Sequence, residues 1–206
     1  MKKIHLYYAG MATGILFLFG VILGAIITPD YSSMSNTVSE LFETGAENRV
    51  LFSSIFFFTS ILIVLFSIGI IMNHPYKKNK PLFIGGIILM IIGIFYSLST
   101  SIFPTDPPGT EATLPGTLHM TLVYINLLLT IILLPYLSLA LYRQKQWRSF
   151  KLFSFICLAI FIISAVLSPL LIAKGIDALG ATSRITIFTF YLWLFVLAYQ
   201  LIKKPS

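Results

Sequence analysis

Six long apolar runs dominate this sequence and restrict the folds open to it. They cover about residues 6–28, 51–72, 81–102, 118–142, 150–173 and 183–202. Each run can cross a hydrocarbon core about 30 Å thick, which takes roughly 20 helical residues. A membrane barrel would need shorter segments of alternating hydrophobicity, whereas helices satisfy every backbone hydrogen bond in lipid. The runs therefore predict an all-α fold, a polytopic transmembrane six-helix bundle.

Composition supports a membrane protein with one domain. Charged residues make up 10% of the chain, against about 25% in an average soluble domain. The first run is longer than the core of a signal peptide, about 7–15 residues, so we expect it to stay as a first span. No linker or low-complexity segment divides the sequence, which predicts a single membrane domain over residues 1–206.

The charges divide between the two sides of the predicted bundle. One side holds no acid and 11 of the 14 basic residues: Lys2, Lys3, Lys77, Lys78, Lys80, Arg143, Lys145, Arg148, Lys151, Lys203 and Lys204. The other side holds three basic and all seven acidic residues, a net charge of −4. Basic residues accumulate in cytoplasmic loops. We therefore expect a multi-pass protein of the cell membrane with both termini in the cytoplasm, and we attribute the net charge of +7 to orientation rather than to binding of nucleic acid.

The predicted outer loop 29–50 has a helical pattern of its own. Met34, Val38, Leu41 and Phe42 fall on one helical face, and Thr37 with Glu40 fits a capping box. A short helix on the membrane surface or over the mouth of the bundle is expected here. Two roles stay open for Ser39 and Glu40: capping this helix, or lining a polar site.

The outer loop 103–117 places an acid near a histidine. Asp106 lies in the run Phe103-Pro104-Thr105-Asp106-Pro107-Pro108-Gly109, which must turn because two prolines exclude a helix. Gly116 or Thr117 is expected to open the fourth span, with His119 in its first turn. Asn126 and Thr130 share the face of His119, and such a polar stripe usually faces the bundle.

Arg184 begins the last span and breaks the pattern of cytoplasmic basic residues. It could extend to lipid headgroups, or it could pair with one of the outer acids. Asp106, His119 and Arg184, with Ser39 and Glu40, therefore form a candidate site at the outer mouth. A structural network of hydrogen bonds is the competing interpretation, because buried charges pair for structural reasons too.

Several kinds of chemistry are disfavoured by the residues present. Cys157 is the only cysteine, so neither a disulfide nor a cysteine-based metal site is expected. His5 and His74 lie on the side opposite His119, so no metal site and no cofactor is predicted. Asp106 and His119 would suit a hydrolase with a histidine base. No charge lies in the middle of a span, which disfavours ion-coupled transport.

Short motifs along the chain resemble the domain-of-unknown-function 998 family of prokaryotic membrane proteins. The motifs are Val38-Ser39-Glu40-Leu41, Ile102-Phe103-Pro104-Thr105-Asp106, Thr117-Leu118-His119 and Gly180-Ala181-Thr182-Ser183-Arg184-Ile185. The resemblance implies a six-helix bundle and leaves the activity open. The chain also resembles, more remotely, the DRAM-like six-helix membrane proteins, a group associated with membrane-lipid organisation. This likeness rests on Ser39, Glu40, Gly45 and Asn48.

The leading functional hypothesis is a membrane protein that binds or handles a lipid or small amphiphile at the outer mouth. Asp106, His119 and Arg184 would contact the headgroup, with Ser39 and Glu40 as a lid. The alternatives are a membrane-embedded hydrolase that uses Asp106 and His119, and a small transporter. The sequence leaves open whether the protein is an enzyme, and it does not define the oligomeric state.

Overall fold

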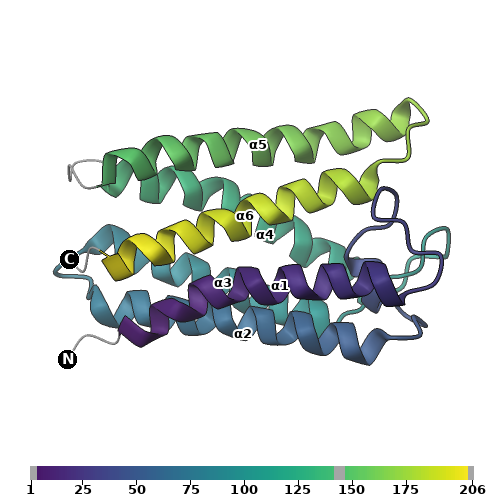
Figure 1. Cartoon of the computed structure of the whole chain (residues 1–206), viewed down its shortest axis with the longest axis horizontal. Helices are drawn as coiled ribbons and strands as arrows, with labels where there is room; N and C mark the ends of the chain where they lie inside the picture. Colours follow the sequence, from purple (N-terminus) through teal and green to yellow (C-terminus); the bar gives the residue numbers. More distant parts are fainter. Residues whose placement is uncertain (1–3, 142–146, 204–206) are drawn as a thin grey trace.

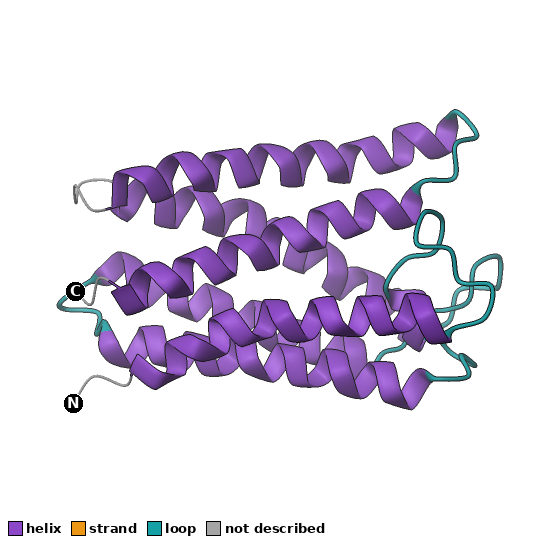
Figure 2. Ribbon diagram, viewed as in Figure 1, coloured by secondary structure: helices purple, strands orange, loops and turns teal. Residues whose placement is uncertain are grey.

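The computed structural model describes residues 4–141 and 147–203 and is built from six long helices (Figures 1 and 2). Five basic residues and one residue of the fourth predicted span lie outside the described residues: Lys2, Lys3, Arg143, Lys145 and Lys204, and residue 142. The helices are α1 Tyr7–Ile27, α2 Arg49–Asn73, α3 Lys80–Ser101, α4 Leu114–Leu141, α5 Arg148–Ala173 and α6 Leu179–Lys203. All six are long and apolar enough to cross a membrane. The prediction of a six-helix all-α bundle is thus confirmed.

The six helices form a closed ring. Each packs against the next in sequence, and α6 returns to pack against α1. Successive helices run in opposite directions, so the chain segments at both ends of the described region lie at one end of the bundle (Figure 1). We call this the terminal end. The opposite end carries the segments 28–48, 102–113 and 174–178, and we call it the loop end.

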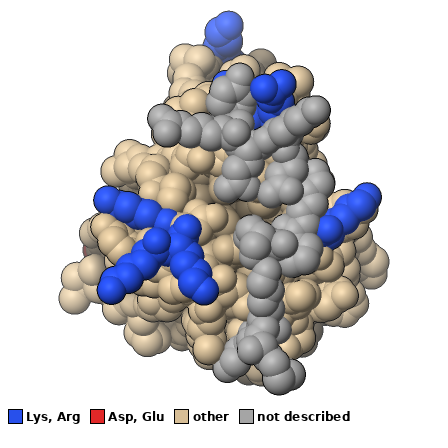
Figure 3. All heavy atoms as spheres, turned by 90° about the vertical axis from the view of Figure 1, so that its left-hand side faces the viewer, with Lys and Arg blue, Asp and Glu red and all other residues tan. Residues whose placement is uncertain are grey.

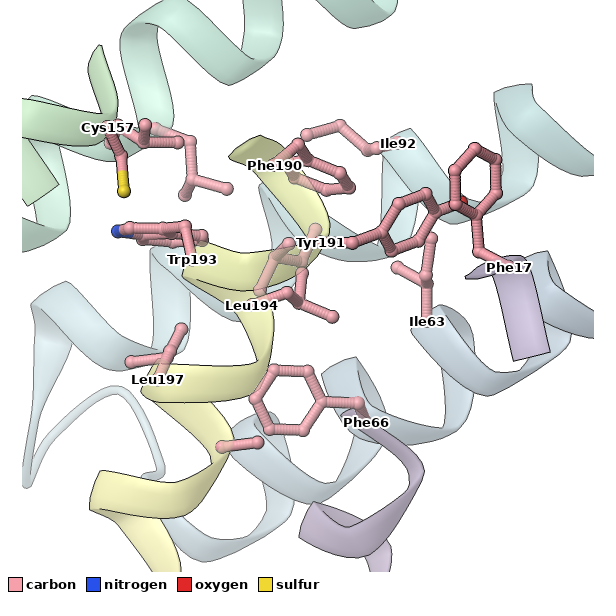
Figure 4. Packing of buried hydrophobic residues seen from close by; sticks show 14 of the residues in the cluster. Phe17, Ile63, Phe66, Ile92, Cys157, Phe190, Tyr191, Trp193, Leu194 and Leu197 are labelled. Carbon is pink, nitrogen blue, oxygen red and sulfur yellow. The ribbon is translucent and has the colours of Figure 1, made fainter. Parts of the chain in front are cut away.

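Aromatic residues fill the centre of the ring (Figure 4). The ring of Phe17 from α1 stacks on Tyr191 from α6, with 4.4 Å between centroids. Trp193 is fully buried and donates its indole N–H to Ser154 Oγ on α5 at 2.9 Å. Helices in lipid associate through close packing and such polar contacts, because lipid tails are as apolar as the core. The described interior is therefore densely packed with side chains from several helices.

Glycine lets α1 approach its neighbours closely. A Cβ atom on Gly10 would lie 2.8 Å from the ring of Phe66 on α2. One on Gly24 would lie 2.4 Å from Leu41, in the segment that follows α1. Leu41 is almost fully buried, so Gly24 makes room for the loop-end segment to insert a side chain beside α1.

The two ends of the bundle differ in charge. The face at the terminal end shows lysine and arginine side chains and no acidic side chain (Figure 3). All seven acids fall in the segments of the loop end. Among the described residues, the fold therefore has the charge separation expected from the sequence. The cytoplasmic location of the termini stays a prediction.

Candidate functional site

Asp106 holds the start of α4. Its Oδ2 accepts a hydrogen bond from the Thr113 backbone N–H at 2.8 Å, and its Oδ1 accepts one from Thr113 Oγ1 at 2.7 Å. Thr113 Oγ1 in turn accepts from the Gly116 N–H at 3.2 Å, as an N-cap residue does. The two hydrogen bonds from Thr113 lower the pKa of Asp106, against a smaller opposing effect of burial. The carboxylate is therefore held in its charged form by the N-cap.

His119 is buried, with 2% of its surface exposed, and binds the end of α3. Its Nδ1 lies 3.0 Å from the carbonyl oxygen of Ser99 and 2.9 Å from that of Phe103. Carbonyl oxygens only accept hydrogen bonds, so Nδ1 carries a proton, and this N–H donates to both carbonyl oxygens. The imidazole therefore ties the first turns of α4 to the last turn of α3 and to the segment that follows it.

Arg184 is buried, with 7% of its surface exposed, and binds the segment between α1 and α2. Its Nη1 donates to the carbonyl oxygens of Ser33 at 2.7 Å and Asn36 at 2.6 Å. Its Nη2 donates to the hydroxyl of Tyr31. Burial raises the pKa of Tyr31 to about 12 although the charge of Arg184 opposes this shift. The phenol is thus neutral, and the guanidinium has no anionic partner among the described residues.

The first turn of α6 binds the same loop segment. The backbone N–H of Gly180 donates to the carbonyl of Ser35 at 3.0 Å, and that of Ala181 donates to Met34 at 2.9 Å. A Cβ on Gly180 would lie 2.4 Å from the Asn36 carbonyl oxygen. Four consecutive carbonyls, those of residues 33–36, therefore face donors from the start of α6. We call these contacts the α6 latch.

Glu40 organises the loop from within. Its Oε1 accepts from the Thr37 N–H at 2.7 Å and from Thr37 Oγ1 at 2.8 Å, and its Oε2 accepts from Asn36 Nδ2. The bond from the Thr37 N–H to Glu40 is one half of the expected capping box. The other half is not formed, because Thr37 Oγ1 donates to the Glu40 carboxylate and the N-cap residue is Val38. The short helix is a 3-10 helix, η2 Ser39–Phe42. Ser39 Oγ lies 3.0 Å from Thr37 Oγ1, so it belongs to the same local network.

The five predicted site residues fall into two groups. Glu40 and Ser39 lie in the loop that Arg184 holds, whereas Asp106 and His119 organise the junction of α3 and α4. The groups meet where the Thr44 N–H donates to the Thr105 carbonyl at 3.0 Å, and where the Phe42 ring lies 6.0 Å from that of His119. In the described part of the chain, no hydrogen bond joins Asp106, His119 and Arg184 to one another.

Metal binding has no support in the described geometry. Among residues 4–141 and 147–203, no three His, Cys, Asp or Glu side chains are grouped closely enough to hold an ion. Cys157 is buried in α5 with a free thiol.

The sequence did not point to several residues that shape the loop end. Thr113 donates two hydrogen bonds to Asp106, Gly116 leaves room for that carboxylate, and Tyr31 accepts a hydrogen bond from Arg184. The Thr113-x-x-Gly116 spacing with Pro115 is a detectable helix start. The role of Tyr31 depends on a contact 153 residues away in the chain, for which the sequence gives no signal.

Comparison with known proteins identifies a family. Neither the curated proteins nor the solved structures include a match to this chain. The model of one family, described as "Protein of unknown function (DUF998)", matches residues 11–200, which covers all six helices except a few residues at their outer limits. The chain therefore belongs to the DUF998 family of proteins of unknown function.

Proposed function

We propose that this protein binds an amphiphile with an anionic headgroup, such as a membrane lipid, at its loop end. The supporting observation is that the buried guanidinium of Arg184 donates its hydrogen bonds to neutral acceptors and forms no ion pair with a described acid. A guanidinium that is 7% exposed has only neutral acceptors, and its Nε has no hydrogen-bond partner. A buried charge without a counter-ion is costly, and a phosphate or carboxylate is the natural bidentate partner of arginine.

The α6 latch would act as a lid over this cation. Carbonyl oxygens of residues 33–36 occupy the positions around Arg184 and the first turn of α6 that an anion would favour. The loop with Ser39 and Glu40 would move aside when a headgroup replaces these carbonyls. The segment that contains Asp106 would contact the lid through the bond from the Thr44 N–H to the Thr105 carbonyl. His119 would contact it through the ring of Phe42.

The geometry offers less to the two alternative functions. A hydrolase would need Asp106 to orient His119, but the Nδ1 proton of His119 already binds two carbonyls. Asp106 is itself occupied by Thr113. A transporter would need a polar path, and no described Asp, Glu, Lys or Arg lies in the middle of a span. No specific observation therefore favours either one.

Measurement of lipid that copurifies with the protein tests the proposal. Wild type, Arg184→Gln and Lys174→Gln would be purified in mild detergent, and bound lipid would be quantified by native mass spectrometry. Loss of one strong charge-assisted contact should weaken binding about tenfold or more. We expect this loss in Arg184→Gln only, because Lys174 is an exposed basic residue outside the latch.

A lid variant keeps the test decisive if Arg184→Gln does not fold. Tyr31→Phe removes the acceptor of Nη2 and keeps the cation, so it should exchange bound lipid faster than wild type. Equal lipid content in a folded Arg184→Gln protein would refute the proposal. Unchanged lipid exchange in Tyr31→Phe would refute the lid.

A further inference from the structure

A second feature of the loop end is an open groove between α2 and α3. It has a volume of about 560 Å³ and is lined by Arg49, Val50, Ser53, Ser54, Phe57, Phe58 and Ser101. Ser101 ends α3, and the other lining residues form one stripe along the first turns of α2. The groove shares no residue with the α6 latch.

The groove carries a positive charge that the described residues do not neutralise. Arg49 is the first residue of α2 and forms no ion pair with any described acid. The first turn of α2 contains no acid, and Asn48 gives no side-chain cap. A helix start is already the positive end of the helix dipole, so a cation there is unfavourable without an anion nearby. Glu47 precedes the helix but is exposed and unpaired with Arg49.

Three serines lie beside this cation. Ser54 donates its hydroxyl to the Val50 carbonyl at 2.7 Å, and Ser101 donates to that of Ser97 at 2.6 Å. Ser53 is partly buried and its hydroxyl has no partner among the described residues. It is therefore available to donate to a bound anion.

The groove becomes apolar with distance from Arg49. Phe57 and Phe58 are eight and nine residues beyond Arg49, a rise of about 12–14 Å along a helix. This distance leads from the headgroup region into the hydrocarbon of one leaflet, whose depth is about 15 Å. Phe58 is 59% exposed on the surface that would face lipid. The polar and apolar parts thus follow the depth profile of a bilayer.

We propose that this groove binds a phospholipid with a net negative headgroup, taken from the leaflet at the loop end. The phosphate would lie between the Arg49 guanidinium and the Ser53 hydroxyl, and an acyl chain would lie along Phe57 and Phe58. Charge complementarity selects the anionic headgroup, and the apolar end of the groove selects a lipid over a soluble anion. The inference depends on the groove alone and does not require that Arg184 binds a ligand.

Nanodiscs test this site with defined lipids. Wild type, Arg49→Gln, Lys174→Gln and Phe58→Ala would be reconstituted in phosphatidylcholine with about 10% phosphatidylglycerol, and the lipids retained after extraction would be compared by native mass spectrometry. Arg49→Gln should lose about tenfold or more of the phosphatidylglycerol preference. Phe58→Ala should retain less total lipid than wild type. Lys174→Gln should match wild type in both the amount and the kind of lipid retained.

Several outcomes would overturn the proposal. If Arg49→Gln keeps the preference for phosphatidylglycerol, Arg49 does not bind the headgroup. An equal loss of this preference in Lys174→Gln would indicate a general effect of charge. Competition by millimolar inorganic phosphate would indicate a soluble anion instead of a lipid. A shift from dimer to monomer in Arg49→Gln, without a change in lipid, would assign the groove to a second copy of the chain. Arg49→Gln should lower retained phosphatidylglycerol in an Arg184→Gln background as much as it does in wild type, which separates this test from that of the proposed function.

Discussion

The carboxylate of Asp106 lies directly over the Cα atom of Gly116. A Cβ atom built on Gly116 would be 1.9 Å from Asp106 Oδ2. The contact requires glycine at this position, because any side chain would displace the acid from Thr113. The start of α4 and the loop before it are thus fitted to each other.

Gly116→Ala should therefore destabilise the protein by about 1–3 kcal/mol, the usual cost of overpacking a close contact. Thermal unfolding followed by the fluorescence of Trp147 and Trp193 would measure it. Gly14→Ala is the matched control, since its Cβ would have no neighbour closer than 3.6 Å. Alanine is a better helix former than glycine, so this control should be neutral or slightly stabilising. An unchanged midpoint in Gly116→Ala would contradict the fitted contact.

His119→Leu should lower stability by about 1–3 kcal/mol, because the carbonyls of Ser99 and Phe103 lose a buried donor. His119→Asn should retain more stability, since its amide N–H can replace Nδ1–H. The same thermal assay distinguishes the two variants. If leucine is tolerated as well as asparagine, the hydrogen bonds of His119 do not hold α3 and α4 together.

Glu43→Gln should stabilise the protein at neutral pH. Burial, followed by the charge of Glu40, raises the pKa of Glu43, and its Oε2 has no hydrogen-bond partner. A raised carboxyl pKa means that the folded state binds more protons than the unfolded state, so stability falls as pH rises above the ordinary value of about 4.3.

The gain from Glu43→Gln should therefore be present at pH 7.5 and nearly absent at about pH 3, well below the ordinary pKa of glutamate, where both side chains are mostly neutral. Unfolding midpoints of wild type and variant at the two pH values would show this. A gain of equal size at both values would indicate that charge is not the cause.

Single cysteines can test the orientation. Thr110 is exposed at the loop end and Lys78 is exposed at the terminal end, whereas Cys157 is buried and should react slowly. A membrane-impermeant maleimide should label Thr110→Cys in intact cells and Lys78→Cys only after lysis. The reverse pattern would place the termini outside.

The helices were predictable because length and hydrophobicity determine a membrane span, but two of their starts were not. Helix α4 begins at Leu114, two or three residues before the expected start at Gly116 or Thr117, and α6 begins at Leu179, four residues before the predicted span. These first turns are polar or rich in glycine, so a hydrophobic run does not include them. Thr113 caps one, and the carbonyls of Met34 and Ser35 bind the other.

The candidate site was predictable in its residues and not in its contacts. Arg184 is conspicuous in the sequence as a basic residue on the acidic side, and lipid headgroups or outer acids were its expected partners. Its partners are instead two backbone carbonyls and Tyr31. Every residue carries a carbonyl, so the sequence cannot show which of them the folded loop turns toward an arginine.

The α6 latch has a consequence for the order of biosynthesis. Residues 33–36 emerge from the ribosome early, whereas Arg184, about 150 residues later, emerges after five spans have been made. Until then the carbonyls of this loop have no partner from α6 and must be hydrated. The bonds between the first loop and α6 can therefore form only after the sixth helix has been made, late in the synthesis of the chain.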